Sequence, residues 1–501
     1  MAKVNLDALI PREDFEAVGA NNTGNLKHSV SVSDFTNSFF YPFIRKPDFQ
    51  RETSEWDARK ISDFLESYIN GDLIPSIILW RSNTGLFFVI DGAHRLSAIT
   101  AWIFDDYGDG EISRKFYEGN IPDDHKIIAG DARNHINKKI GSYQDIISAP
   151  KQSTPNLDYL NRARNLGAFS IQVQWVEGDA RKAETSFFKI NQQGEPLNNT
   201  ELKLLKSRKN GNAIAARAII RAGSGHKYWS NFSAENQNKI QELSEEINQI
   251  LFTPPLKKTV KSLDQLPIAG RISAAQALPL ILDFVNIVNH ISGETSHTDR
   301  EDPNGEDTIL YLSKARKIAW RMNSIHASSL GLHPIVYFYS ADGRHKTASF
   351  YAIAAWILDT ENKKAFREFI NVREDFEQLL LKYDYLIQEV NRKYRQAITS
   401  YLHIKDFYIE CIKELSSGKS IDESILEITA NQKFSYLKLD SMRDEVTSAN
   451  FSSERKSAVY IREALKNAVR CSICNGLIGQ SSITIDHTLR KQDAMVSCFF
   501  L

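Results

Sequence analysis

Cysteine is scarce in this sequence, with four residues in 501. So few cysteines in so long a chain argue against a disulfide framework and favour a reducing cytoplasm. An excess of charge is also missing, because 62 Lys and Arg balance 62 Asp and Glu. Any contact with nucleic acid must therefore come from local basic patches and not from a global field. The first sixteen residues, MAKVNLDALIPREDFE, lack the apolar stretch of a signal peptide.

Long uninterrupted apolar runs are absent as well. The most apolar long segment, 272–291, contains Pro279, Asp283 and two asparagines, which predicts a buried helix and not a membrane span. Hydrophobic residues make up 42% of the chain and charged residues 25%, which is ordinary for a globular protein with about two to four domains. We expect a cytoplasmic protein without a membrane-spanning segment.

The chain divides by pattern into three parts. Residues 1–208 mix strand and helix signals, residues 209–465 are mostly helical in periodicity, and residues 466–501 form a short tail. In the first part, the spacing from Ser54 to Asp57 is typical of a helix start, and Gly71 follows where that helix would end. Strands are expected at 74–80, 86–90 and 169–175. Helices are expected within 238–252, 308–326, 349–359 and 363–414.

The sharpest local feature is the run VIDGAHRLSAI, residues 89–99. An apolar strand ends at Asp91, Gly92 permits a tight turn, and a helix starts with His94 and Arg95 in its first turn. A helix N-terminus offers unpaired amide donors and the positive end of the helix dipole, which suits a phosphate. Cationic side chains there would be repelled unless an anion were present. Alternatively, Asp91 binds a divalent ion, or it pairs with Arg95 and closes the turn.

The sequence Asp91-Gly92-Ala93-His94-Arg95 resembles the Asp-Gly-Gln-Gln-Arg signature of the N-terminal domain of GmrSD-type restriction endonucleases. It is also similar to the Gly-Cys-His-Arg phosphate loop of sulfiredoxin, and both belong to the ParB/sulfiredoxin-like fold. Residues 48–52 before Trp56 resemble the Gln-Arg…Trp motif of the same GmrSD family, and residues 187–197 resemble its Phe-x-x-Ile-Asn-x-x-Gly-x-Pro-Leu motif. Three motifs in the right order make a much stronger signal than one.

The resemblance implies that the three motifs converge on one nucleotide site formed by Arg51, Asp91, Gly92, His94, Arg95, Asn191 and Gly194. Without it, Arg51 is a surface charge and 191–194 is simply a turn. The family resemblance further implies binding and hydrolysis of a nucleoside triphosphate with Mg²⁺. In that family the nucleotide domain gates DNA cleavage by an HNH domain, in restriction of modified or foreign DNA.

A basic stretch follows the last motif. Residues 201–230 hold seven Lys and Arg against the single acid Glu201. Such a stretch can follow a phosphate backbone, or it can be one solvated helix face.

The tail pairs two cysteines with an Asp-His dipeptide. Cys471-Ser472-Ile473-Cys474, followed by Asp486-His487, resembles the start of an HNH nuclease. The resemblance implies a zinc site at Cys471 and Cys474, His487 as the general base and Asp486 as a ligand of a catalytic cation. Alternatively, the cysteines are a chance pair packed as small hydrophobic residues.

Later parts of an HNH domain are missing from the tail, since no second cysteine pair follows His487. Zinc takes four ligands, and besides the first pair only Cys498 or a non-catalytic His487 could contribute. The sequence thus predicts an incomplete HNH-like tail that does not cleave DNA as written. A homo-oligomer or a partner protein could complete it.

We therefore expect an α+β ParB/sulfiredoxin-like domain, a helical region and an incomplete ββα-metal tail. The expected function is that of a nucleotide-binding and nucleotide-hydrolysing DNA-defence protein. A second reading is a nucleotide-dependent DNA-binding regulator of ParB type that does not cleave. A third is a phosphotransferase of sulfiredoxin type. It is the weakest, because Ala93 stands where sulfiredoxin has its reactive cysteine.

Overall fold

The structure is a computed structural model of the whole chain. It describes residues 2–13, 26–37, 39–47, 50, 53–82, 84–117, 119, 121, 123–193, 207–224, 227–256, 261–263, 266–272, 277–291, 300–363, 366–439, 453–483, 485–487 and 498–500. The chain forms two compact units, which are described separately. The first consists mainly of residues 1–209, and the second of 210–223, 232–272 and 276–501.

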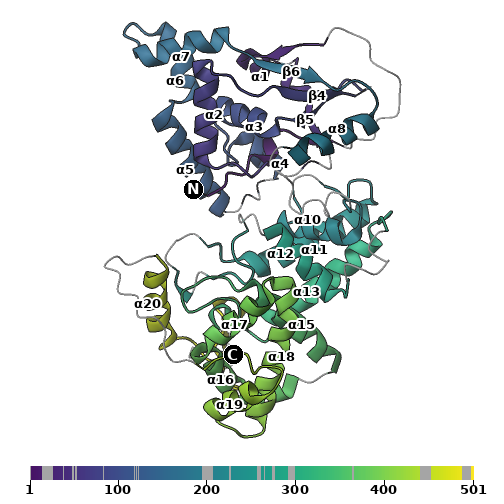
Figure 1. The fold of residues 1–501 in the computed structure, drawn as a ribbon, viewed down its shortest axis with the longest axis vertical. Coiled ribbons are helices and arrows are strands. Elements are labelled where there is room, and N and C mark those ends of the chain that lie inside the picture. The colour runs from purple at the N-terminus through teal and green to yellow at the C-terminus, as the bar shows by residue number, and fades with distance from the viewer. Residues whose placement is uncertain are drawn as a thin grey trace. The chain divides into compact units, whose positions relative to one another are not determined.

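A mixed six-stranded sheet is the centre of the first unit (Figure 1). Its strands are β1 (Arg12–Glu13), β2 (Ser29–Val30), β3 (Ile44–Pro47), β4 (Ile77–Arg81), β5 (Phe87–Asp91) and β6 (Ile171–Trp175). They lie in the order β1-β3-β5-β4-β6-β2. Pairs β1–β3, β3–β5 and β4–β6 are parallel, whereas β4–β5 and β2–β6 are antiparallel. The expected strand-turn-strand is confirmed as β4 and β5, and the expected strand at 169–175 as β6.

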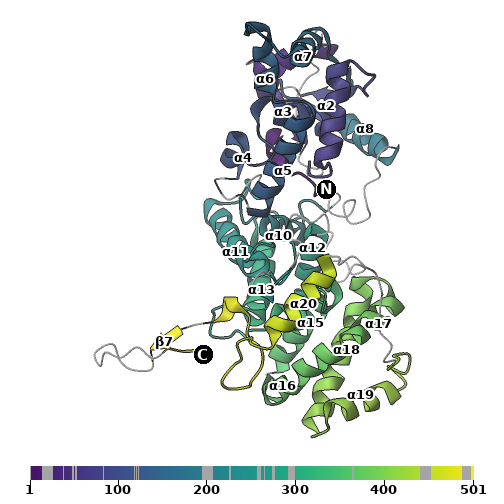
Figure 2. The same ribbon diagram turned by 90° about the vertical axis from the view of Figure 1, so that its left-hand side faces the viewer.

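Helices cover both faces of this sheet. One face packs against the main core, to which α2 (Ala58–Asn70), α3 (Ala93–Phe104) and α5 (Asp123–Lys139) contribute buried side chains (Figure 2). Helix α8 (Ala180–Gln193) covers the other face through Ala183 and Phe187, which pack with Trp80, Phe88 and Ile90. The shorter helices of this unit are α1 (Val32–Thr36), α4 (Glu111–Phe116), α6 (Tyr143–Ser148) and α7 (Leu157–Ala168), with 3-10 turns at Asp7–Leu9, Tyr41–Phe43 and Ala149–Lys151. Alternation along β5 sends Val89 into one core and Ile90 into the other.

Helix α2 starts three residues later than its sequence suggests. The N-cap is Asp57, whose side chain accepts a hydrogen bond from the Lys60 N–H, and Ser54 lies before the helix. The helix starts at this later position because the carboxylate of Asp57 accepts the Lys60 N–H, which Ser54 is too far away to bind. At the other end, Gly71 adopts φ 77°, the left-handed conformation that ends helices.

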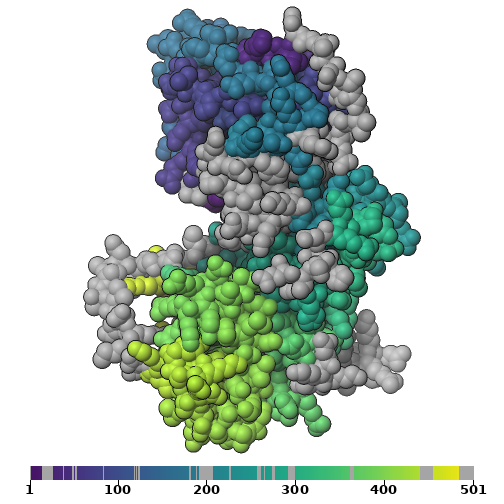
Figure 3. Space-filling model, turned by 45° about the vertical axis from the view of Figure 1, so that its right-hand side comes forward, coloured from purple at the N-terminus to yellow at the C-terminus, as the bar shows by residue number. Residues whose placement is uncertain are grey.

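The second unit is built almost entirely of helices. They are α10 (Gly211–Ile220), α11 (Ala234–Phe252), α12 (Ala277–Val288), α13 (Glu306–Met322), α14 (Pro334–Tyr337), α15 (Thr347–Lys363), α16 (Phe366–Lys382), α17 (Asp384–Tyr394), α18 (Ala397–Ser416), α19 (Ile421–Ala430) and α20 (Ser453–Leu465). The apolar segment expected to be a buried helix is α12, most of whose side chains are buried. In the space-filling view, α16 to α19 close over one another into a continuous body (Figure 3).

The end of the chain contains a turn with two cysteines and a short pair of strands. A 3-10 turn at Gln480–Ser482 follows the cysteine pair, and β7 (Ile485–His487) pairs antiparallel with β8 (Cys498–Phe500). Within the described parts of the chain, no helix is long and apolar enough to cross a membrane.

Candidate functional site

The loop at Asp91 has the expected form of strand, glycine turn and helix. Strand β5 ends at Asp91, and Gly92 is the N-cap of α3 with φ 97°. A Cβ on Gly92 would lie 2.6 Å from the Cγ2 of Ile77. Both the backbone angle and the close packing therefore require glycine here. The first intrahelical bond runs from the Leu96 N–H to the Gly92 carbonyl, so the amides of residues 93–95 come before the hydrogen-bond ladder of the helix.

Arg95 bonds to Asp91 across this turn. Its Nη2 donates to the Asp91 Oδ2 at 2.7 Å and to the Ser76 carbonyl at 3.0 Å. Of the alternatives for Asp91, the structure therefore shows the pairing with Arg95, which fixes the guanidinium beside the start of α3. The Arg95 side chain remains 15% exposed and that of Asp91 34% exposed.

A pocket of about 530 Å³ opens at this loop. Its lining comes from the segment before α2, from α2, from the Asp91 loop and from α8, and consists of Gln50, Thr53, Trp56, Lys60, Asp63, Ile90, Asp91, Gly92, Ala93, His94, Arg95, Phe187 and Ile190. All three sequence motifs therefore contribute to one pocket. The ring of His94 stacks on Trp56, with centroids 5.5 Å apart. This stacking restricts the orientation of the His94 imidazole.

Two buried polar atoms of this lining have no hydrogen-bond partner among the described residues. They are the Nε of Arg95, a donor, and the Oε1 of Gln50, an acceptor. Buried polar atoms are nearly always satisfied by protein, water or ligand. The pocket therefore offers both a donor and an acceptor at its wall, and its volume lies within the range of small-molecule sites.

A buried group of charged side chains holds the segment that forms one wall of the pocket. Asp7 pairs with both Arg12 and Lys46, and all three side chains are 1% exposed or less. The Oδ1 of Asp7 accepts the Thr53 N–H at 3.1 Å, and the Arg12 Nη2 donates to the Gln50 carbonyl at 3.0 Å. Gln50 and Thr53, which both line the pocket, are thus each bonded to this cluster. Sequence reasoning missed this cluster, because isolated charged residues in a sequence are expected at the surface.

Several predicted residues of the nucleotide site cannot be placed in full. Arg51 and Gly194 lie outside the described residues, and of Asn191 only the backbone is described. That backbone belongs to α8, which continues to Gln193. Residues 191–193 are therefore helical, and the expectation of a turn is wrong for them. Phe187 and Ile190 line the pocket from the same helix.

The basic stretch after the third motif is less exposed than its sequence suggests. Arg217 and Arg221 lie at α10 and its C-cap, and both are buried. These two arginines therefore do not belong to an exposed basic face. Of the remaining cations, Arg208, Lys209 and Lys227 are partly exposed.

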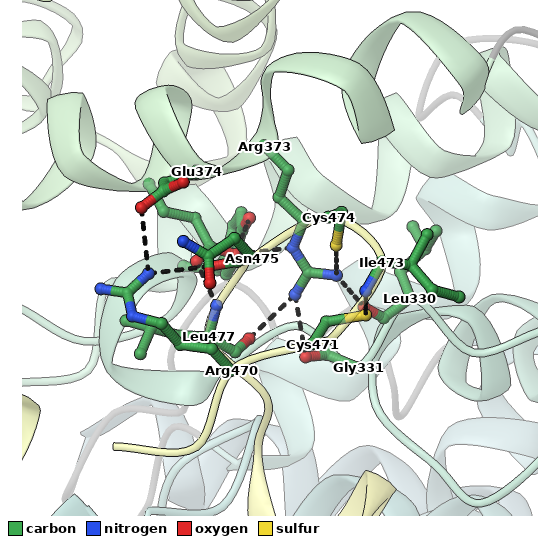
Figure 4. Close-up of polar contacts among 12 residues, drawn as sticks. Leu330, Gly331, Arg373, Glu374, Arg470, Cys471, Ile473, Cys474, Asn475 and Leu477 are labelled. Carbon is green, nitrogen blue, oxygen red and sulfur yellow. Dashed lines mark hydrogen bonds and ion pairs between the residues drawn. The ribbon is translucent and has the colours of Figure 1, made fainter. Parts of the chain in front are cut away.

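The cysteine pair lies in a tight turn of the second unit (Figure 4). The Cys471 N–H donates to the Gly476 carbonyl at 2.9 Å, and the Ile473 N–H donates to the Cys471 Sγ at 3.4 Å. Burial raises the pKa of the Cys474 thiol. Burial opposes the thiolate of Cys471 too, but the N–H groups of Cys474 and Ile473 outweigh it, so the pKa of Cys471 is lowered. Amide donors aimed at sulfur favour metal-binding thiolates.

This turn brings two cysteine side chains, Cys471 and Cys474, close together. Among the described residues, no group of three or more His, Cys, Asp and Glu side chains could hold a metal ion. Asp486 and His487 lie on β7, where His487 pairs in register with Cys498. The side chains of these three residues lie outside the described part of the chain.

Comparison with known families finds one match. The family model for the GmrSD restriction endonuclease N-terminal domain matches residues 32–208, about a third of the chain. No curated protein and no solved structure matched the chain. The matched region contains the sheet from β3 to β6, the Asp91 loop and α8. Residues 32–208 are therefore similar to the N-terminal domain of GmrSD restriction endonucleases.

Proposed function

We propose that this chain is a nucleotide-dependent DNA-defence protein of the restriction endonuclease type. The family of residues 32–208 supports the restriction role and, through it, DNA as a partner. The observation that carries the nucleotide part is the single pocket that all three sequence motifs line. We assign its domain to the ParB/sulfiredoxin-like fold, because the mixed sheet ends one strand in a glycine turn at a helix N-terminus.

In this proposal the triphosphate lies against the start of α3. The amides of Ala93, His94 and Arg95 donate to phosphate oxygens, and the Nε of Arg95 adds a charge-assisted bond. Lys60 at the rim adds a second cation, while Gln50 offers its oxygen to a hydroxyl or amino group of the nucleotide. Asp91 orients Arg95 in this scheme. Mg²⁺ bound together with the nucleotide would offset the negative charge of the phosphates and so assist hydrolysis.

For the tail we propose a metal-binding part of HNH type. Cys471 and Cys474 fit half of a zinc site, because their turn points backbone N–H groups at sulfur. Asp486 and His487 are proposed as cation ligand and general base, which is supported by their sequence pattern and their place on one strand. We expect that the chain by itself does not cut DNA. Alternatively, a second copy of the chain or a partner protein completes the nuclease.

Calorimetric titration with the four common nucleoside triphosphates, with and without Mg²⁺, tests the nucleotide part. Arg95→Ala should weaken binding roughly ten- to a hundred-fold, as expected for loss of a charge-assisted bond worth about 1.5–3 kcal/mol. The exposed Arg164→Ala in α7 is the matched control and should bind as wild type. Absence of binding by the wild type would reject this part of the proposal.

Incubation with modified phage DNA, nucleotide and manganese tests the DNA part. Cutting that disappears in His487→Ala would show a working HNH tail and contradict the expected inactivity. Nucleotide-dependent DNA binding without cutting would favour the regulator of ParB type.

A further inference from the structure

One arginine of the helical unit contacts the cysteine turn. Arg373 of α16 is 4% exposed, and its guanidinium uses every nitrogen (Figure 4). Its Nε donates to the Glu377 Oε1 at 2.8 Å, and its Nη2 donates to the carbonyls of Gly331 at 3.1 Å and Leu477 at 2.9 Å. Its Nη1 donates to the Leu330 carbonyl at 2.6 Å and lies 3.7 Å from the Cys474 Sγ.

The partner of this arginine also holds the turn. Glu377 is 1% exposed, and it accepts the Leu477 N–H at 2.5 Å and the Tyr337 hydroxyl at 2.8 Å. Leu477 therefore donates its N–H to Glu377, and its carbonyl accepts a hydrogen bond from Arg373. A buried ion pair so completely hydrogen-bonded fixes geometry, because breaking any contact leaves a buried charge short of a partner.

Close packing supports the same conclusion. A Cβ on Gly476 would overlap the Arg373 guanidinium, so glycine alone allows the backbone after the second cysteine to approach this closely. Two further contacts continue the attachment, a bridge between Leu332 and Ile478 and a hydrogen bond from the Ser482 hydroxyl to Asn323. The cysteine turn is thus part of the packed helical unit.

We propose that Arg373 is a positioning residue for a metal ion bound at Cys471 and Cys474. This inference rests on the metal-binding part of the proposed function. The guanidinium of Arg373 contacts both the sulfur of Cys474 and the carbonyls of Leu330 and Gly331. Metal binding at the turn is therefore coupled to the order of residues 330–337 and of α16.

The physical basis is linkage. A metal that binds only the ordered turn stabilises whatever unfolds together with that turn. Arg373 and Glu377 join the turn to the 330–337 segment and to α16, so all three share the stabilisation. Residues that orient a metal ligand typically change metal affinity 10- to 100-fold when mutated, and we expect a loss in this range for Arg373→Gln.

The test compares zinc binding and hydrogen exchange in the full-length protein. Zinc content and affinity are measured by competition with a chelating dye for wild type, Arg373→Gln, Arg373→Lys and the control Arg367→Gln, which alters an exposed residue of the same helix. Cobalt substitution gives the absorption spectrum of thiolate coordination. Wild type and Arg367→Gln should slow exchange on zinc addition both in the turn and in 330–337 and α16. In Arg373→Gln the effect should be weaker and confined to the turn.

Each result decides between the two claims. Zinc binding by wild type with protection confined to the turn would overturn the coupling and leave the metal site standing. The coupling would also be overturned if Arg373→Gln bound zinc as tightly as wild type and showed the same protection from hydrogen exchange. A wild type that takes up neither zinc nor cobalt would reject the metal site itself, and the positioning role with it. Arg373→Lys keeps the charge but loses the planar fork, so it should give intermediate affinity if Arg373→Gln proves too unstable to fold.

Discussion

Asp7, Arg12 and Lys46 hold the pocket wall of the first unit, whereas Arg373 and Glu377 hold the cysteine turn of the second. Both groups of charges are buried. Each group forms hydrogen bonds to residues that lie outside helices and strands, beside a candidate site. They differ in what they touch. Among the described contacts, the first cluster bonds to the pocket lining at the backbone of Gln50 and at the backbone and hydroxyl of Thr53. Arg373, in contrast, lies against a candidate metal ligand itself.

This difference predicts different consequences of mutation. In the first unit, a lost charge should change stability and shift the pocket wall, with no direct effect on a ligand. In the second unit, loss of Arg373 removes both the attachment and a donor to sulfur. Buried ion pairs cost desolvation free energy. Their presence at both candidate sites is therefore better explained by positioning than by stability.

The largest expected effect comes from breaking the cluster of the first unit. Asp7→Asn leaves Arg12 and Lys46 without the carboxylate that pairs with both, which should lower the free energy of unfolding by about 3–5 kcal/mol. Chemical denaturation measures this. The exposed Asp131→Asn in α5 is the control and should stay within about 0.5 kcal/mol of wild type. Equal stability of the two variants would show that the cluster does not hold the unit together.

Acid should weaken the second unit. Burial lowers the pKa of His333 to about 4, with a smaller contribution from the Arg373 charge, and burial also lowers the pKa of His345 to about 4. A lowered histidine pKa means that stability is fully present above about pH 6.5 and is lost as the pH falls toward 4. Each histidine should contribute roughly 2 kcal/mol less at pH 5 than at pH 7.5.

Denaturation curves at the two pH values check this expectation. His333→Asn keeps an N-cap for α14 but cannot titrate, so its stability should fall about half as much between pH 7.5 and pH 5. An unchanged pH dependence in this variant would contradict the assignment.

A smaller effect is expected from crowding the cysteine turn. Gly476→Ala places a methyl group on the Arg373 guanidinium, and overpacking of this kind costs about 1–3 kcal/mol. Gly130→Ala in α5 is the control, since a Cβ there meets nothing within 4 Å and alanine is the better helix former by about 0.5–1 kcal/mol. The melting temperature should thus fall in Gly476→Ala and rise in Gly130→Ala. An unchanged melting temperature in Gly476→Ala would indicate that Arg373 does not pack against the turn.

Much of the first unit was predictable from local pattern. Two apolar runs around a polar turn predicted β4 and β5, and alternation predicted β6. Gly92 indicated the turn that starts α3. The motifs also predicted that distant segments meet, and the pocket brings together Gln50, the Asp91 loop and Phe187. These features follow from short-range rules or from a family signature.

The rest depends on contacts that no local rule reports. Asp7 meets Lys46 across 39 positions, and Arg373 meets Leu477 across 104. In the sequence, Asp7, Lys46 and Arg373 look like ordinary surface charges. The long helical run 363–414 likewise gave no sign of its division into α16, α17 and α18, because period alone does not show where tertiary packing turns the chain.

The central claim is that the pocket at the Asp91 loop binds a nucleoside triphosphate, and direct titration of the full-length protein tests it most simply. We predict saturable, Mg²⁺-dependent binding of at least one triphosphate by wild type and by Arg164→Ala, with roughly ten- to a hundred-fold weaker binding by Arg95→Ala. Circular dichroism should show all three proteins folded. Binding that is equally tight in wild type and folded Arg95→Ala, or that no triphosphate shows with wild type, would contradict the claim.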